Sequence, residues 1–187
     1  MENKKVNIYL EANPNPNSLK FVADYMLVEP GKNYDFPDIE SAKHAPLATE
    51  LFGYDYVRRV FYMSNFVTVT KTDEKNWVEI KEELKEHIKN YLESGRPLLE
   101  DSDTEAPIQE TEMDIKIKGL LDEYVKPAVE QDGGAIEYKS FDDGVVKVFL
   151  QGSCSGCPSA TVTLKVGIEN LLKSMIPEVK AVEAEEV

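Results

Sequence analysis

Apolar and polar positions alternate in short runs along the first half of the chain, which predicts β-strands. VNIYLEA and LKFVADYMLV flank the turn-rich NPNPNS, and VRRVFYMSNFVTVTK contains two β-branched and aromatic runs around Ser64 and Asn65, the pattern of a hairpin. LATELFGY predicts a short helical segment. A longer helix is predicted beyond it, ending near Gly95 and Pro97. Its apolar positions are Trp77, Ile80, Leu84, Ile88, Tyr91 and Leu92.

The second half begins with a predicted helix, marked by Thr111 and Asp114 at capping-box spacing, which Pro127 should end or kink. Its expected apolar face is Ile117, Leu120, Leu121, Tyr124, Val125 and Ala128. QDGG predicts a turn, and AIEYKSF and VVKVFLQG predict an antiparallel hairpin joined at DDG. A helix over 158–175 should follow, and then a strand, EVKAVEAE, on the hairpin edge. The residues of that helix expected to face inward are Leu164, Ile168, Leu171, Leu172 and Met175.

An acidic segment separates these halves. From Glu100 to Asp114 the chain has seven acidic residues and no basic one, and Pro97 and Pro107 interrupt any helix. Such a segment buries too little apolar surface to order itself, which predicts a solvated linker; the alternative is an acidic loop inside one domain. The predicted fold class is α+β, with two small domains, 1–95 and 111–187, joined by a linker at 96–110. Each domain is expected to be an antiparallel sheet packed with helices.

Composition narrows the classes of function. The chain has 187 residues and a formal net charge of −14, which argues against a nucleic-acid partner or an anionic membrane. No apolar run approaches the roughly 18 residues that would span a bilayer. The opening MENKKVNIYLEANPNPN lacks both a secretory apolar core and the composition of a transit peptide. We therefore expect a cytoplasmic protein in a reducing environment.

The chemistry is concentrated in LQGSCSGCPSA, which contains the only two cysteines, Cys154 and Cys157. Pro158 suits the first position of a helix, so the second cysteine lies at the helix N-terminus, where amide N–H groups and the macrodipole favour thiolate over thiol. Gly152 and Gly156 allow backbone amides to approach the sulfurs and a bulky inorganic ligand to enter. The serines of the loop are expected to be polar and exposed: Ser153, Ser155 and Ser159.

Several roles compete for a lone CxxC pair. Inert buried cysteines fit poorly in a polar, glycine-rich loop, and a disulfide across two residues stabilises little in a reducing compartment. A dithiol oxidoreductase also places CxxC at a helix N-terminus, but that fold needs a parallel crossover, whereas the preceding strands predict an antiparallel hairpin. Zinc could tether two chains. The histidines offer no ligand set, since His44 lies in a loop and His87 lies on an apolar helix face as a core or interface residue.

Ligand number favours a cluster shared by two chains. One chain supplies two thiols, and two chains supply the four thiolates that hold either a [2Fe–2S] or a [4Fe–4S] cluster. A cluster bridging two exposed loops would suit transfer better than storage.

The second half, DGGAIEYKSFDDGVVKVFLQGSCSGCPSATVTLKVGIENLLKSMIPEVKAVEAE, closely resembles the NifU C-terminal domain of the Nfu family of iron–sulfur scaffold and carrier proteins. NPNPNSLKF, APLATELFG and RRVFYMSNFVTVTK resemble the Nfu N-terminal domain. The chain departs from the family at Ala135, where an acidic residue often follows the paired glycines.

The resemblance implies a non-enzymatic scaffold. Cys154 and Cys157 would bind a [4Fe–4S] cluster, or a [2Fe–2S] cluster, between two subunits and deliver it to apo iron–sulfur client proteins. An upstream scaffold would load it. We expect a cluster-bridged homodimer that is a monomer when apo. The first domain is expected to recognise clients or the loading partner, and NPNPN and the Arg58–Arg59 pair are expected to be a turn and a solvated strand edge.

Overall fold

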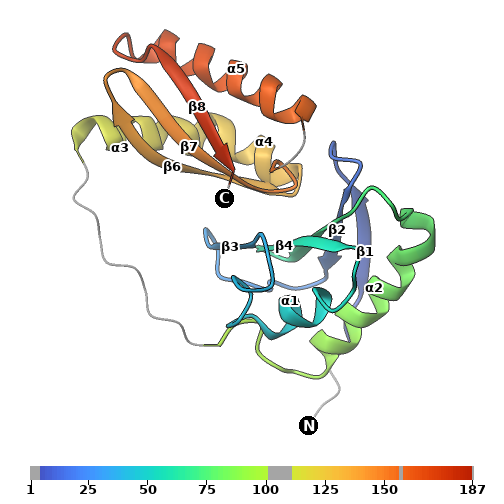
Figure 1. Ribbon diagram of the computed structural model, residues 1–187. Helices are drawn as coiled ribbons and strands as arrows, with labels where there is room; N and C mark the ends of the chain where they lie inside the picture. Colours follow the sequence, from blue (N-terminus) through green and yellow to red (C-terminus); the bar gives the residue numbers. More distant parts are fainter. Residues whose placement is uncertain (1–4, 101–110, 156–157, 187) are drawn as a thin grey trace. The chain divides into compact units, whose positions relative to one another are not determined.

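The computed structural model describes residues 5–100, 111–155 and 158–186 (Figure 1). The chain divides into two compact units, Met1–Asp103 and Thr104–Val187. Residues 101–110 of the expected linker lie outside the described residues, as do Gly156 and Cys157.

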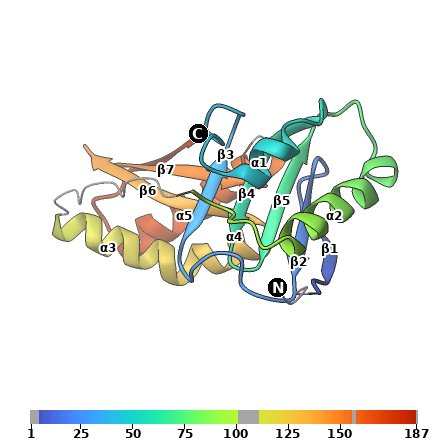
Figure 2. The same cartoon turned by 90° about the horizontal axis from the view of Figure 1, so that it is seen from below.

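The first unit is a five-stranded antiparallel sheet in the order β1-β2-β5-β4-β3. Its strands are β1 (Ile8–Ala12), β2 (Ser18–Ala23), β3 (Asn33–Phe36), β4 (Val57–Met63) and β5 (Phe66–Lys71). The helices α1 (Pro46–Leu51) and α2 (Trp77–Glu93) cover one face of the sheet, where the core lies (Figures 1 and 2). The predicted hairpin is confirmed, and its turn residue Ser64 takes a positive φ of 48°. The antiparallel α+β class of this unit is therefore confirmed.

The long helix α2 follows the predicted spacing. Its buried residues are Ile80, Leu84, Ile88, Tyr91 and Leu92. The Asn76 side chain caps its N-terminus by accepting from the Val78 N–H at 3.0 Å, which satisfies one of the unpaired first-turn donors. Gly95 leaves the helix with φ +70°, a conformation that glycine adopts without strain.

Residues 96–100, which their composition assigned to the linker, pack on the first unit. The Tyr91 hydroxyl donates to the Pro97 carbonyl at 2.6 Å, and the Glu100 N–H donates to the His44 carbonyl at 2.8 Å. Leu98 and Leu99 contact the core. These two leucines supply the apolar area that the acidic residues after them lack.

The second unit is a three-stranded sheet in the order β6-β7-β8 with helices on one face (Figure 2). Its elements are α3 (Glu112–Leu120), η1 (Leu121–Val125), α4 (Lys126–Gln131), β6 (Gly134–Asp142), β7 (Val145–Gly152), α5 (Pro158–Met175) and β8 (Ala181–Glu186). The DDG hairpin is confirmed, since both turn residues, Asp143 and Gly144, have positive φ values of 50° and 86°. The last strand joins the hairpin edge as predicted. It runs parallel to β7 because α5 carries the chain back across the sheet.

The helical segment that opens this unit contains a π-helical turn, η1. This turn changes which residues of the segment face the core. The Thr111–Asp114 capping box is confirmed. Pro127 has no N–H to donate four residues back, and the Lys126 N–H instead donates to the Leu121 carbonyl five residues back. The buried positions follow at intervals of four residues, namely Ile117, Leu121, Val125 and Val129. The expectation that Tyr124 and Ala128 belong to the apolar face was therefore wrong, since both are exposed.

The helix α5 packs largely as predicted. Ile168 and Leu172 are buried, and Leu164 and Leu171 are partly buried. Met175 is 46% exposed, so its inward position was wrong. Ile176, four residues after Leu172, takes the buried place, and its N–H donates to the Leu172 carbonyl at 2.7 Å.

Candidate functional site

The CxxC loop connects the end of β7 to the start of α5. The helix begins at Pro158, as predicted from its preference for the first helical position. An 18-residue helix presents the positive end of its macrodipole and unpaired N–H groups toward the loop that precedes it. Its first turn carries no acidic residue. Cys157 lies outside the described residues, so of the two cysteines the structure places only Cys154.

Cys154 packs against Gly134, the first residue of β6. Its side chain belongs to the core of the second unit, and the residue is 6% exposed. A Cβ added to Gly134 would lie 2.8 Å from the Cys154 Sγ, 3.1 Å from the Cys154 N and 2.6 Å from the Gln151 carbonyl oxygen. The separations from the sulfur and from the carbonyl oxygen are shorter than real Cβ contacts, so the bare Cα of Gly134 allows the thiol to occupy its position.

Sequence reasoning assigned QDGG to a turn and missed this contact. Gly133 serves the turn, with φ +81°, but Gly134 already belongs to β6 and pairs with Gly152. A glycine inside a strand is the sequence signal for a close backbone approach, and that signal was present.

Two of the three serines, Ser153 and Ser155, are buried, so the expectation of exposure was wrong for them. Ser153 is 2% exposed and Ser155 is 5% exposed. The Ser153 hydroxyl donates to the Asp132 carbonyl, and its N–H donates to the Gly133 carbonyl at 3.3 Å. The loop folds down because these bonds fasten it to the turn before β6. Nothing is described of the Ser159 side chain.

Gly152 directs the chain from β7 into the loop. Its φ of +63° lies in the left-handed region, which costs little for glycine and more for other residues. The Ser155 N–H donates to the Gly152 carbonyl at 3.2 Å and closes a tight turn around Cys154. The arrangement holds the Cys154 thiol against the bare backbone of Gly134, in the loop that leads from β7 to α5.

The first unit has a polar network but no metal-ligand cluster among its described residues. His87 is partly buried, as predicted. It lies between the Tyr54 hydroxyl, 2.9 Å from Nδ1, and the Glu50 Oε2, 3.0 Å from Nε2. Arg96 binds the other Glu50 oxygen at 2.6 Å, and this hydrogen bond lowers the pKa of the Glu50 carboxyl. The network fastens α1, α2 and the segment after α2 to one another, which is a structural role.

The NPNPN loop forms the turns that its composition predicts. The Asn15 N–H donates to Asn13 Oδ1 at 3.1 Å, and the Asn17 N–H donates to Asn15 Oδ1 at 3.0 Å. The Trp77 indole N–H donates to the Pro16 carbonyl at 2.9 Å and ties the loop to α2.

The arginine pair divides into two roles. Arg58 is exposed to solvent as expected, but β4 lies between β5 and β3, so the expected strand edge was wrong. Arg59 forms an ion pair with Asp35 of β3, with side-chain exposures of 13% and 2%. Arg59 therefore links two strands of the sheet.

Among the described helices, none is long and apolar enough to cross a membrane.

Both units match known protein families. Residues 8–95 match the family described as "Scaffold protein Nfu/NifU N terminal", and residues 117–183 match the "NifU-like domain". The "NFU1 iron-sulfur cluster scaffold homolog, mitochondrial" of Drosophila willistoni is 42% identical over 187 residues, which cover 98% of this chain and 65% of that protein. From Arabidopsis thaliana, "NifU-like protein 4, mitochondrial" and "NifU-like protein 5, mitochondrial" are each 45% identical over 186 residues and 95% of this chain. The match covers 65% and 67% of their own lengths, respectively.

The two matched domains define the class as a two-domain protein with an Nfu/NifU scaffold N-terminal domain and a NifU-like domain. The chain belongs to the Nfu/NifU-like family, as its motifs predicted. It spans about 65% of the length of the first of these relatives.

The comparison corrects one expectation. We expected a cytoplasmic location from the composition of the first residues, but the relatives above are named as mitochondrial proteins. The expected location was therefore wrong, because the composition of a segment that begins a given sequence does not report where the protein resides.

Proposed function

We propose that this chain carries a [4Fe–4S] cluster between two protomers and transfers it to apo-proteins. Cys154 and Cys157 of each protomer would be the ligands, and the cluster is cargo rather than a resident cofactor. The observation that carries the proposal is the position of Cys154, which lies against the Gly134 backbone and in the loop before the N-terminus of α5. The family assignment makes iron–sulfur chemistry the first choice for these thiols.

Ligand number supports the need for two chains. The sequence contains two cysteines, whereas either common cluster takes four thiolates. Among the described residues no three His, Cys, Asp or Glu side chains gather to complete a site. A second copy of the loop supplies the missing pair, and the metal-free chain is then a monomer.

Transfer proceeds by ligand exchange. A thiolate of the acceptor forms a bond to iron as a Cys154 or Cys157 thiolate leaves, so that one Fe–S bond replaces another and no electron is needed. An interprotomer cluster is accessible to such attack from outside. The burial of Cys154 implies that the loop must open when the cluster binds.

Anaerobic reconstitution with iron and sulfide tests the proposal. Size-exclusion chromatography with absorbance and iron measured across the peak should show a brown dimer with about four irons per two chains. Cys154→Ala and Cys157→Ala should each abolish the cluster while circular dichroism remains unchanged. Ser174→Ala, at an exposed position of α5, is the control and should bind a normal amount of iron. Wild-type iron in either cysteine variant contradicts the ligand assignment, and a colourless dimer that contains zinc contradicts the cluster.

The structure gives one observation in favour of a dithiol oxidoreductase. The sequence argued against that class because the strands before the cysteines form an antiparallel hairpin. However, β7 and β8 are parallel and are connected by α5, so the CxxC does lie between a strand and a helix of a parallel crossover. Insulin reduction by the metal-free protein separates the two functions, since sustained turnover without iron favours the redox enzyme.

A further inference from the structure

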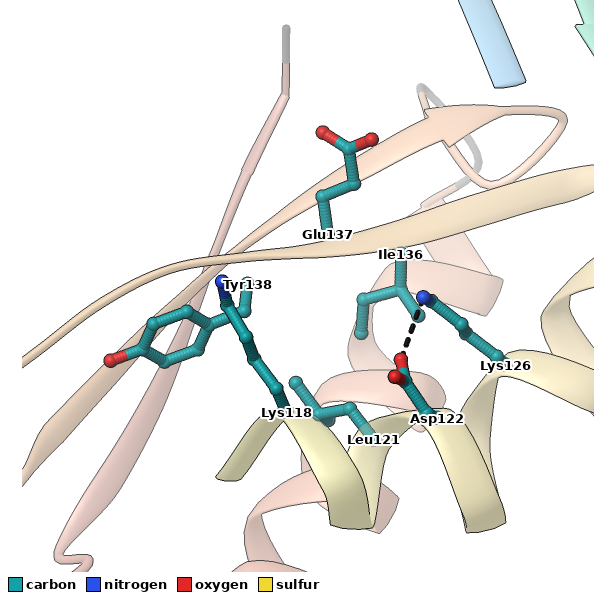
Figure 3. A pocket seen from close by; sticks show the side chains of 7 residues that line it. All are labelled: Lys118, Leu121, Asp122, Lys126, Ile136, Glu137 and Tyr138. Atoms are coloured by element: carbon teal, nitrogen blue, oxygen red, sulfur yellow. Dashed lines mark ion pairs between the residues drawn. The ribbon is translucent and has the colours of Figure 1, made fainter. Parts of the chain in front are cut away.

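A groove in the second unit lies between the helical segment α3–η1–α4 and the edge strand β6 (Figure 3). Its volume is about 290 Å³. The residues that line it are Lys118, Leu121, Asp122, Lys126, Ile136, Glu137 and Tyr138. Neither the family match nor the chemistry of the cysteines assigns a role to this groove.

The groove has an apolar floor and a fixed side wall. Leu121 and Ile136 form the floor and are 2% and 1% exposed. The Tyr138 hydroxyl donates to Asp114, the residue that caps α3, and the Lys118 ammonium lies 5.6 Å from the centre of the Tyr138 ring. The hydroxyl hydrogen bond and the contact of the ammonium with the ring face together fix the position of the Tyr138 side chain in this wall.

The π-helical segment aligns the charges along the rim. Positions four residues apart drift around a regular α-helix, which turns every 3.6 residues. The wider turn of η1 offsets that drift, so Lys118, Asp122 and Lys126 follow one line just as the buried residues beside them do. Two ammonium groups therefore border the same groove, as Figure 3 shows.

Those ammonium groups can be reached by a ligand. The Lys126 Nζ lies 2.6 Å from an Asp122 oxygen, but the two side chains are 38% and 57% exposed, and an exposed pair of this kind is readily exchanged. The Glu137 carboxylate points to the other side of β6 from the floor in Figure 3. The groove thus places two cations, with Asp122 between them, above a buried apolar floor in a protein whose net charge is −14.

We propose that this groove binds an extended acidic peptide segment of a partner protein. One apolar side chain would cover Leu121 and Ile136, and carboxylates on either side would bind Lys118 and Lys126. An edge strand beside a helix suits an extended ligand, since alternate side chains then point into the groove.

The groove lies close to the cysteine loop, which connects peptide binding to cluster transfer. Ile136 is two residues along β6 from Gly134, which contacts Cys154, and two residues of a strand span about 7 Å. A partner docked here lies beside the cysteine loop and can exchange a cluster with it. This last step rests on the proposed function, whereas the binding itself does not.

The test uses the full metal-free chain and a defined probe. The probe is a blocked, fluorescein-labelled nine-residue peptide of alternating Glu and Leu, and its counterpart has Lys in place of Glu. Fluorescence anisotropy should show binding of the Glu peptide, weakened about tenfold or more in Lys118→Glu/Lys126→Glu. Lys116→Glu, on the same helix but outside the groove, is the matched control and should bind within about twofold of wild type. Amide chemical shifts of the labelled protein should move at Leu121, Ile136 and their neighbours.

Three results would overturn the groove assignment: equal binding of the Lys peptide, unchanged binding by the double variant, or shifts confined to other surfaces. None of them bears on the cluster, because iron is absent throughout. Conversely, a chain that binds the peptide but assembles no cluster contradicts the proposed function and leaves the groove in place.

Discussion

Substitution of Gly134 by alanine probes the contact on which the cysteine loop rests. The added methyl would lie 2.6 Å from one carbonyl oxygen, 3.1 Å from one backbone nitrogen and 2.8 Å from the Cys154 sulfur. Two of these three neighbours are backbone atoms in a paired strand end or a pinned turn, so they cannot rotate away. Overpacking of this kind costs about 1–3 kcal/mol, and the rigid neighbours place the expected loss near the upper end of that range.

The assay is differential scanning calorimetry of the metal-free chain, with the second unit followed as its own transition. A loss of about 3 kcal/mol should lower the melting temperature of a unit of this size by about 12–24 °C. The same variant should assemble less cluster, because relief of the clash displaces the Cys154 thiol. The first unit should melt unchanged.

Two other glycines of the same unit provide matched controls. Gly119 and Gly167 are helical, and an added Cβ would meet nothing within 4 Å at either position. Alanine there should raise stability by about 0.5–1 kcal/mol, since glycine is the poorer helix former. If Gly134→Ala melts like wild type or like these controls, the close approach of Gly134 to Cys154 is refuted.

Three further predictions follow from the structure. Cys154 in the native metal-free protein should react with iodoacetamide at least about tenfold more slowly than in urea, because it is 6% exposed; equal rates by peptide mass spectrometry contradict its burial. Gly144→Ala should cost about 1–3 kcal/mol in urea unfolding, since φ is +86° and the new methyl would lie 2.9 Å from the Glu178 carbonyl oxygen. The Tyr138 hydrogen bond lowers the pKa of Asp114, so its contribution to stability is present above the unfolded pKa of about 3.9 and is lost as pH falls through the lower folded value. Tyr138→Phe should flatten that acid-side loss in the second unit, and an unchanged pH profile contradicts the assignment.

Local signals predicted much of this architecture. Apolar periodicity located α2, and the capping box located the start of α3. Turn residues located both hairpins, and Pro158 located the start of α5. Each of these signals acts within a few residues, so one sequence suffices to detect it.

The errors had both local and distant causes. Met175 lost its inward place to Ile176, and Ser153 became buried because its bonds reach a turn about twenty residues earlier. The shift of Tyr124 out of the core depended on a change of helix type at Pro127. For the site, the sequence supplied the cysteines as candidate ligands, and it could not show that Gly134 lies against one of them.

The parallel pairing of β8 with β7 has a consequence for biosynthesis. During translation β6, β7 and the cysteine loop are made before β8, so the nascent sheet has an open edge at β7 and lacks the fully buried Val182. The sheet that supports the cysteine loop is complete only when β8, the last strand of the unit, has been synthesised. A chain released before Ala181 would hold both thiols in an unfinished fold, so under the proposed function it would assemble less cluster than the complete unit.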